Sequence, residues 1–125
     1  MEQFVINGRV PLNGTLTPSG NKNAALPILA ACLLTQEPVV LRNIPLIGDV
    51  LTLKTILEHL GATITEYDKH TWTVHAKSIL NHTPDPMLCR NIRASILLAG
   101  PMLARHGQLT LPPPGGDVIG RRRLD

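Results

Sequence analysis

The sequence predicts an α/β fold of the α+β type, and three observations lead to that prediction. Residues 21–34 are rich in alanine and leucine, which favours a helix that is apolar on nearly every side and buried all round. Residues 50–60 place apolar side chains at helical spacing. Residues 62–66 and 71–75 alternate as two strands across the turn 67–70, which is typical of a hairpin. Helices and an antiparallel sheet are therefore expected to share one core.

Short strands are expected on both sides of the first helix. Residues 4–6 and 15–17 are apolar or β-branched runs, and residues 39–41 form a third. Asn-Gly pairs at 7–8 and 13–14 favour tight turns between the first two runs. From residue 21 on, the first unit is predicted to be helix, strand, helix, strand, strand, with a strand before it.

The remaining helix ends follow from local signals. Asp49 is expected to cap the second helix, and Gly61 to end it. A long apolar helix is predicted over residues 87–106, with a kink at Pro101. A strand over residues 108–111 is expected to follow.

An internal repeat is visible when the chain is shifted by seventy positions. Residues 23–26 then fall on 93–96, and residues 39–41 fall on 109–111. Each pair suggests a small-residue helix followed by a short strand. The second unit reaches Asp125 where its second helix should begin, so we expect the chain to be truncated within a repeat.

Composition argues against a general nucleic-acid binder. The net charge is only +3, and much of the excess comes from the three arginines at 121–123. Aromatic residues, on which bases stack, make up 2% of the chain. The basic run is therefore a local feature, and nucleic acid is not an expected partner.

Targeting and metal signals are weak. Cys32 and Cys89 have no metal or redox spacing, and the first residues lack the pattern of a signal peptide. The apolar runs 24–34 and 94–104 are too short to span a bilayer. We expect a soluble cytoplasmic protein without a membrane partner, and no metal site.

Two positions suggest binding of an anion. Gly20 to Asn23 opens a helix, where free amides, the helix dipole and Lys22 favour negative charge. The alternative there is a helix cap beside a solvated lysine. Arg93 lies within an otherwise apolar helix, so its guanidinium must reach a carboxylate, solvent or an anionic ligand.

The segment 111–123 combines the features of an anion-binding loop. Three prolines lead to Gly115 and Gly116, and then come Asp117 and the arginine run. Guanidinium groups pair with two oxygens of a phosphate or carboxylate at once. The alternative is a surface connection that ends in a solvated basic tail.

Three segments together, 19–29, 92–96 and 114–120, resemble the UDP-N-acetylglucosamine enolpyruvyl transferases (1-carboxyvinyltransferases) of bacterial peptidoglycan synthesis. The resemblance follows the whole chain in order, although family members are several-fold longer. It implies an inside-out α/β barrel of repeated βαβαββ units with buried helices. Residues 1–20 would be strands of a second domain, and residues 21–125 an incomplete first catalytic domain.

The resemblance also implies a reaction. The family transfers the enolpyruvyl group of phosphoenolpyruvate to the 3-hydroxyl of UDP-N-acetylglucosamine and releases phosphate, without a cofactor. Lys22 and Asn23 match residues at phosphoenolpyruvate, and Arg122 matches the arginine on its phosphate. Arg93 and Asp125 match residues at the sugar nucleotide. A fragment of this length is expected to be inactive alone.

Two positions depart from the family pattern. Arg123 stands where proline is usual, and Asp117 stands where most members have the cysteine linked to proton delivery. A carboxylic acid can serve as the proton donor only if burial raises its ordinary pKa of about 3.9. Because a carboxylate is a poor nucleophile toward the epoxide of fosfomycin, the aspartate predicts resistance to that drug.

Two alternatives remain open. One is the related transferase that acts on shikimate 3-phosphate. The other is a non-catalytic fragment that binds anions or nucleic acid through the arginines at 121–123.

Overall fold

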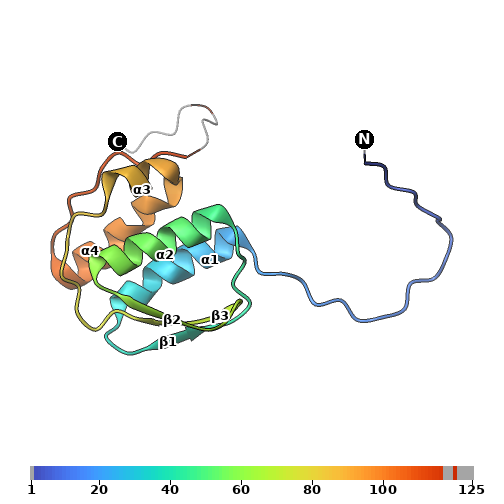
Figure 1. Cartoon of the computed structure of the whole chain (residues 1–125), viewed down its shortest axis with the longest axis horizontal. Coiled ribbons are helices and arrows are strands. Elements are labelled where there is room, and N and C mark those ends of the chain that lie inside the picture. The colour runs from blue at the N-terminus through green and yellow to red at the C-terminus, as the bar shows by residue number, and fades with distance from the viewer. Residues whose placement is uncertain (1, 117–119, 121–125) are drawn as a thin grey trace.

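The computed structural model describes residues 2–116 and residue 120, arranged as a layer of helices over a small sheet (Figure 1). The predicted α+β class is confirmed. The elements are, in order, α1 (Lys22–Ala31), the 3-10 helix η1 (Cys32–Leu34), β1 (Val39–Leu41), α2 (Gly48–Leu60), β2 (Thr63–Asp68), β3 (Thr71–His75), α3 (Pro86–Asn91), the 3-10 helix η2 (Arg93–Leu98) and α4 (Ala99–His106).

The sheet has β3 in its centre, with antiparallel neighbours β1 and β2. The predicted hairpin of β2 and β3 is therefore confirmed. Trp72 and Val74 of β3 are fully buried and face Leu41 and Val39 in the register with β1. Val40, which points to the other face, is 54% exposed. One face of the sheet thus contributes to the core and the other faces solvent.

The second predicted helix, α2, supplies the centre of the core. Its apolar side chains at helical spacing are all fully buried, and the helix packs against α1, α3, η2 and β2. Gly61 ends α2 with a φ of 113°, in the left-handed region where glycine is favoured, as predicted. The predicted cap is wrong, because Ile47 precedes the first helical residue, Gly48, and no side chain caps the helix. Asp49 instead lies inside the first turn.

The first helix begins and ends where the sequence predicts, with Asn21 as its cap and a 3-10 turn that continues to Leu34. The expectation that it is buried all round is wrong. Leu26, Leu29 and Ala30 are buried, whereas Ile28 is 48% exposed. Neighbouring elements cover only one side of α1 in the described part of the chain.

The long helix predicted over residues 87–106 is divided in two, and the break is not at Pro101. The chain leaves helical geometry at Ile92, with φ −135° and ψ 135°. The carbonyl oxygens of Cys89 and Arg90 accept hydrogen bonds from the amides of Gly115 (3.0 Å) and Gly116 (3.2 Å). Bonds to a distant segment thus replace those that would continue the helix. Pro101 lies in the first turn of α4, where proline is tolerated.

The strands predicted at residues 4–6 and 15–17 do not form. Residues 2–19 are exposed, and the arm extends away from the folded layers (Figure 1). A strand needs a neighbouring strand for its backbone groups, and no described strand pairs with this arm. The side chain of Asn43 donates a hydrogen bond to the carbonyl of Pro18 at 3.3 Å. That residues 1–20 belong to a second domain stays a prediction.

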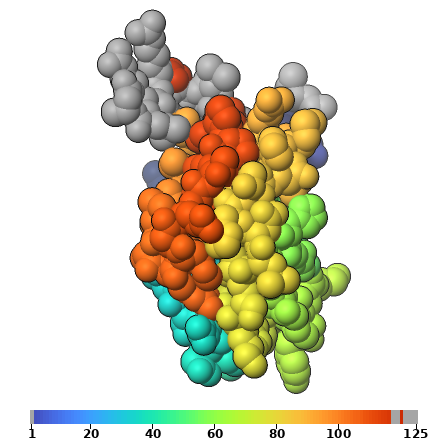
Figure 2. Space-filling model, turned by 90° about the vertical axis from the view of Figure 1, so that its left-hand side faces the viewer, coloured from blue at the N-terminus to red at the C-terminus, as the bar shows by residue number. Residues whose placement is uncertain are grey.

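The strand predicted at residues 108–111 is also absent. In Figure 2 the orange-red segment beyond α4 lies along the yellow segment before α3, and the amide of Thr110 donates to the carbonyl of His82 at 3.0 Å. A single backbone hydrogen bond does not form the ladder of a β-sheet. The two members of the proposed repeat therefore differ, since α1 aligns with the 3-10 helix η2, and β1 with this strand-free segment.

Arg105 joins three segments at the end of α4. Its guanidinium donates to the carbonyls of Leu33 (2.9 Å), Thr35 (3.0 Å) and Lys77 (3.0 Å). Hydrogen bonds from a charged donor contribute about 1.5–3 kcal/mol each when they are protected. Arg105 lies in the last turn of α4, where a cation offsets the helix dipole, and it thus also binds carbonyls of other segments.

We expect stability to fall in mild acid because of His106. Burial lowers the pKa of its imidazole, and the charges of Arg105 and His82 lower it further; the His82 and His106 rings lie 5.5 Å apart. Because folding lowers this pKa, the full free energy of unfolding is available above about pH 6.5, the pKa of histidine in the unfolded chain. It decreases as the pH falls from there through the pKa of the folded protein. Urea unfolding at pH 7.5 and 5.5 measures this loss.

His106→Gln should flatten this pH dependence, whereas His59→Gln, a change of an exposed histidine on α2, should leave it unchanged. Equal slopes for His106→Gln and the wild type would contradict the assignment.

Candidate functional site

The first turn of α1 carries two of the predicted site residues, and Asn21 caps it. The side chain of Asn21 accepts hydrogen bonds from the amides of Asn23 (2.7 Å) and Ala24 (3.2 Å). The helix cap that the sequence left open as an alternative is therefore present, and these two amides are not free for an anion. An anion at this turn must therefore be bound mainly by side chains.

Lys22 has a partner that the sequence did not predict. Its ammonium lies 3.0 Å from a carboxylate oxygen of Asp49, and each side chain is 40% exposed. A cation in the first turn of a helix is disfavoured by the dipole, whereas an anion in the first turn of α2 is favoured. The ion pair places the first turns of α1 and α2 together at one end of the helix layer. The signal available in the sequence was the lysine at an unfavourable helix position.

Gly20 holds the chain tightly at the start of α1. A Cβ atom at this position would lie 1.9 Å from the carbonyl oxygen of Asn43 and 2.7 Å from the ring of Pro45. Only glycine permits this approach. The turn before Lys22 is thereby fixed against the segment that leads into α2.

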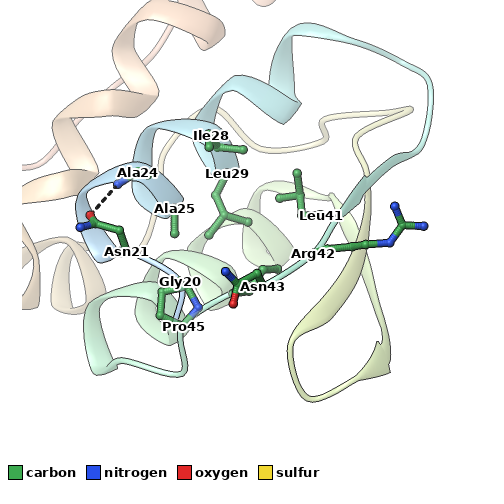
Figure 3. A pocket seen from close by; sticks show the side chains of 11 residues that line it. Gly20, Asn21, Ala24, Ala25, Ile28, Leu29, Leu41, Arg42, Asn43 and Pro45 are labelled. Atoms are coloured by element: carbon green, nitrogen blue, oxygen red, sulfur yellow. Dashed lines mark hydrogen bonds between the residues drawn. The ribbon is translucent and has the colours of Figure 1, made fainter. Parts of the chain in front are cut away.

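A cavity of about 220 Å³ lies beside this turn, between α1 and the chain after β1 (Figure 3). Ala25 and Leu29 of α1 form one wall and Leu41 and Asn43 the other, while the Arg42 side chain extends outward. The lining is mainly apolar. Lys22 and Asn23 do not line it, whereas Gly20 and Asn21 of the same turn do, so the cavity adjoins the predicted anion site.

The sequence predicted that Arg93 lies in the middle of a helix, and this prediction is wrong. Arg93 is the first residue of η2, directly after the break at Ile92, and it is half-buried. A Cβ atom on Gly116 would lie 2.8 Å from the Arg93 amide nitrogen. The structure therefore brings Arg93 against the start of the predicted loop. η2 also packs on α1, the helix that carries Lys22 and Asn23.

The predicted site residues Asp117, Arg122 and Asp125 lie outside the described residues. The path that leads to them is fixed by Gly115 and Gly116, whose amides are bound to the end of α3. Gly116 has a φ of 88°, which disfavours residues other than glycine.

The cysteines have the inert character that the sequence predicts. Cys32 and Cys89 are free and buried, and burial raises the pKa of both thiols. A raised pKa keeps a thiol protonated and unreactive at neutral pH.

The described residues offer neither a cluster of metal-binding side chains nor a membrane-spanning helix. They contain no group of three or more histidine, cysteine, aspartate or glutamate side chains that could hold a metal ion. Among them, no helix has the length and apolar character needed to cross a bilayer.

Comparison with known proteins decides the family. The profile described as EPSP synthase (3-phosphoshikimate 1-carboxyvinyltransferase) matches residues 6–125. This chain belongs to the EPSP synthase family. The expected resemblance to enolpyruvyl transferases is confirmed.

Among its relatives are proteins named UDP-N-acetylglucosamine 1-carboxyvinyltransferase. The one from Bradyrhizobium diazoefficiens is 56% identical over 98% of this chain, and the one from Treponema denticola is 49% identical over the whole chain. The solved enolpyruvyl transferase NikO from Streptomyces tendae superposes with a TM-score of 0.66 at 28% identity, over 80% of this chain and 23% of that protein.

This member of the EPSP synthase family spans only part of its relatives. It covers 28% of the Bradyrhizobium protein and 29% of the Treponema protein. The enolpyruvyl transferase type of fold is supported by the NikO likeness for this part.

We expect Gly115→Ala to detach the segment before the predicted loop. The new Cβ atom would lie 1.5 Å from the Arg90 carbonyl oxygen, so the two backbone bonds from Gly115 and Gly116 cannot both survive. The loss should be about 1–3 kcal/mol in the free energy of unfolding, measured with urea.

Gly100→Ala in α4 is the matched control, because a Cβ atom there meets nothing within 4 Å. It should be neutral or stabilise by up to about 1 kcal/mol. Equal stability of both variants would show that the segment is not held by these contacts.

Proposed function

We propose that the protein transfers the enolpyruvyl group of phosphoenolpyruvate to the 3-hydroxyl of UDP-N-acetylglucosamine and releases phosphate. The observation that carries the proposal is the 45–56% identity, over nearly the whole chain, to relatives named for this activity. The partly exposed side chain of Lys22 supports the proposal, because a phosphate ester that arrives from solvent can reach its ammonium group. In this proposal the enzyme is cytoplasmic and acts in peptidoglycan synthesis.

Lys22 and Asn23 are proposed to contact phosphoenolpyruvate. A lysine ammonium has three donors, and an asparagine amide both donates and accepts. In an addition and elimination, the sugar hydroxyl gives its proton to a base as its oxygen bonds to the central carbon of the enol, and the methylene carbon takes a proton to become a methyl group. Loss of a proton and of phosphate then restores the double bond. The ammonium of Lys22 would stabilise charge on the phosphate oxygens throughout.

Arg93 and Asp125 are proposed to bind the sugar nucleotide, and Arg122 the phosphate of phosphoenolpyruvate. The place of Arg93 beside Gly116 supports this role, since it brings the backbone of Arg93 next to the start of the loop. Asp117 is proposed as the proton donor to the methylene carbon. A carboxylic acid suits that step if the closed site keeps it protonated.

A second candidate is transfer to shikimate 3-phosphate, because the family profile bears the name of that enzyme. The two reactions share phosphoenolpyruvate and differ in the acceptor. Phosphate release measured with each acceptor in turn separates them.

We expect Lys22→Met to lower kcat/KM for phosphoenolpyruvate by at least about 100-fold, because one electrostatic contact to a reacting anion contributes that much. The measurement is phosphate release by the product of the complete reading frame that contains these residues. Lys77→Met, a change of an exposed lysine, should keep wild-type rates. If the wild-type protein releases no phosphate with either acceptor, the proposed function is wrong.

Fosfomycin should leave the enzyme active, because the Asp117 carboxylate opens an epoxide poorly compared with a thiolate. Preincubation with the drug should not reduce activity with time, whereas Asp117→Cys should become sensitive. Mass spectrometry that detects time-dependent alkylation of Asp117 in the wild type would contradict this prediction.

A further inference from the structure

Asp49 occupies a position that the reaction scheme above does not use. It lies in the first turn of α2, and its carboxylate is 3.0 Å from the ammonium of Lys22, in the first turn of α1. The first turn of α1 contains no acidic residue of its own. A lysine at the positive end of a helix thus has its counter-charge on a neighbouring helix.

We propose that Asp49 is a positioning residue, which orients the ammonium of Lys22 toward the anionic substrate. The inference rests on the proposed function of Lys22. A lysine ammonium is a point charge on a flexible four-carbon stem, so a fixed partner is needed to define its direction. One of its three donors goes to Asp49, and the other two are then directed by that bond.

Lys54 on α2 provides a comparison, because its contacts are those of a structural lysine. The ammonium of Lys54 lies 2.8 Å from Glu66 and 3.6 Å from Glu58, and 5.6 Å from the centre of the Trp72 ring. Its side chain is only 20% exposed. Lys54 is enclosed by acidic and aromatic groups of its own chain. Among the residues that the structure describes, Lys22 has one carboxylate partner, Asp49, and its side chain is 40% exposed. The open arrangement leaves room for a ligand.

The position of Asp49 follows from helix packing and not from its own flexibility. α1 and α2 lie side by side over the sheet (Figure 1), and the apolar face of α2 is fully buried. Asp49 has a short side chain next to the buried Val50, so the carboxylate is held near the helix end. A rigid acceptor of this kind is suited to hold a flexible donor.

The test is Asp49→Asn in the product of the complete reading frame, with both substrates titrated separately. We expect the KM for phosphoenolpyruvate to rise about fivefold, the upper range for a partly exposed ion pair. The KM for the sugar nucleotide should change less than twofold. Asp49→Glu, which keeps the charge, should recover part of the loss.

Glu58→Gln is the matched control, because it removes a carboxylate that pairs with a lysine on the same helix, away from Lys22. It should leave both KM values unchanged. Unfolding in urea shows whether each variant is folded. Independently of turnover, a scalar coupling across the hydrogen bond between Lys22 Nζ and Asp49 Cγ should be present in the wild-type NMR spectrum and absent in Asp49→Asn.

The outcomes separate the two proposals. An inactive wild type overturns the proposed function, whatever the NMR result. An active wild type with an unchanged KM for phosphoenolpyruvate in Asp49→Asn overturns the positioning role. A lower KM in that variant also overturns it, because the carboxylate would then compete with the substrate for Lys22. Equal rises in both KM values would show a merely structural role.

Discussion

The burial of one face of α2 is the constraint on which the other elements depend. The apolar side chains of that face are completely buried, and α1, α3, η2 and β2 all pack against the helix. With α2 fixed in this way, the first turns of α1 and α2 lie together, and the contact of Lys22 with Asp49 follows. The ion pair at the candidate site thus depends on the packing of apolar side chains.

Much of the fold could be predicted because its signals are local. The spacing of apolar residues in α2, the alternation in β2 and β3, and Gly61 each report on their own neighbourhood. The predictions are wrong where contacts between residues far apart in the sequence determine the local structure. The break at Ile92 depends on bonds from residues more than twenty positions away, and a strand at residues 4–6 needs a partner edge that the described chain does not provide.

The candidate site was predictable in part for the same reason. Lys22 and Asn23 were identified from a turn that opens a helix, and that turn is present. A helix cap was the alternative that the sequence left open at this turn, and the side chain of Asn21 does bind two of the amides there. The partnership of Asp49 with Lys22 spans 27 positions and arises only from tertiary packing.

The segment before the predicted loop is held by bonds from the amides of Thr110, Gly115 and Gly116 to backbone carbonyls. Bonds of this kind do not depend on the identity of side chains, so the path tolerates sequence drift except where a bulky residue or a proline would break it. The two glycines are such places. Evolution can therefore exchange the chemical groups carried beyond Gly116 without rebuilding the scaffold that presents them.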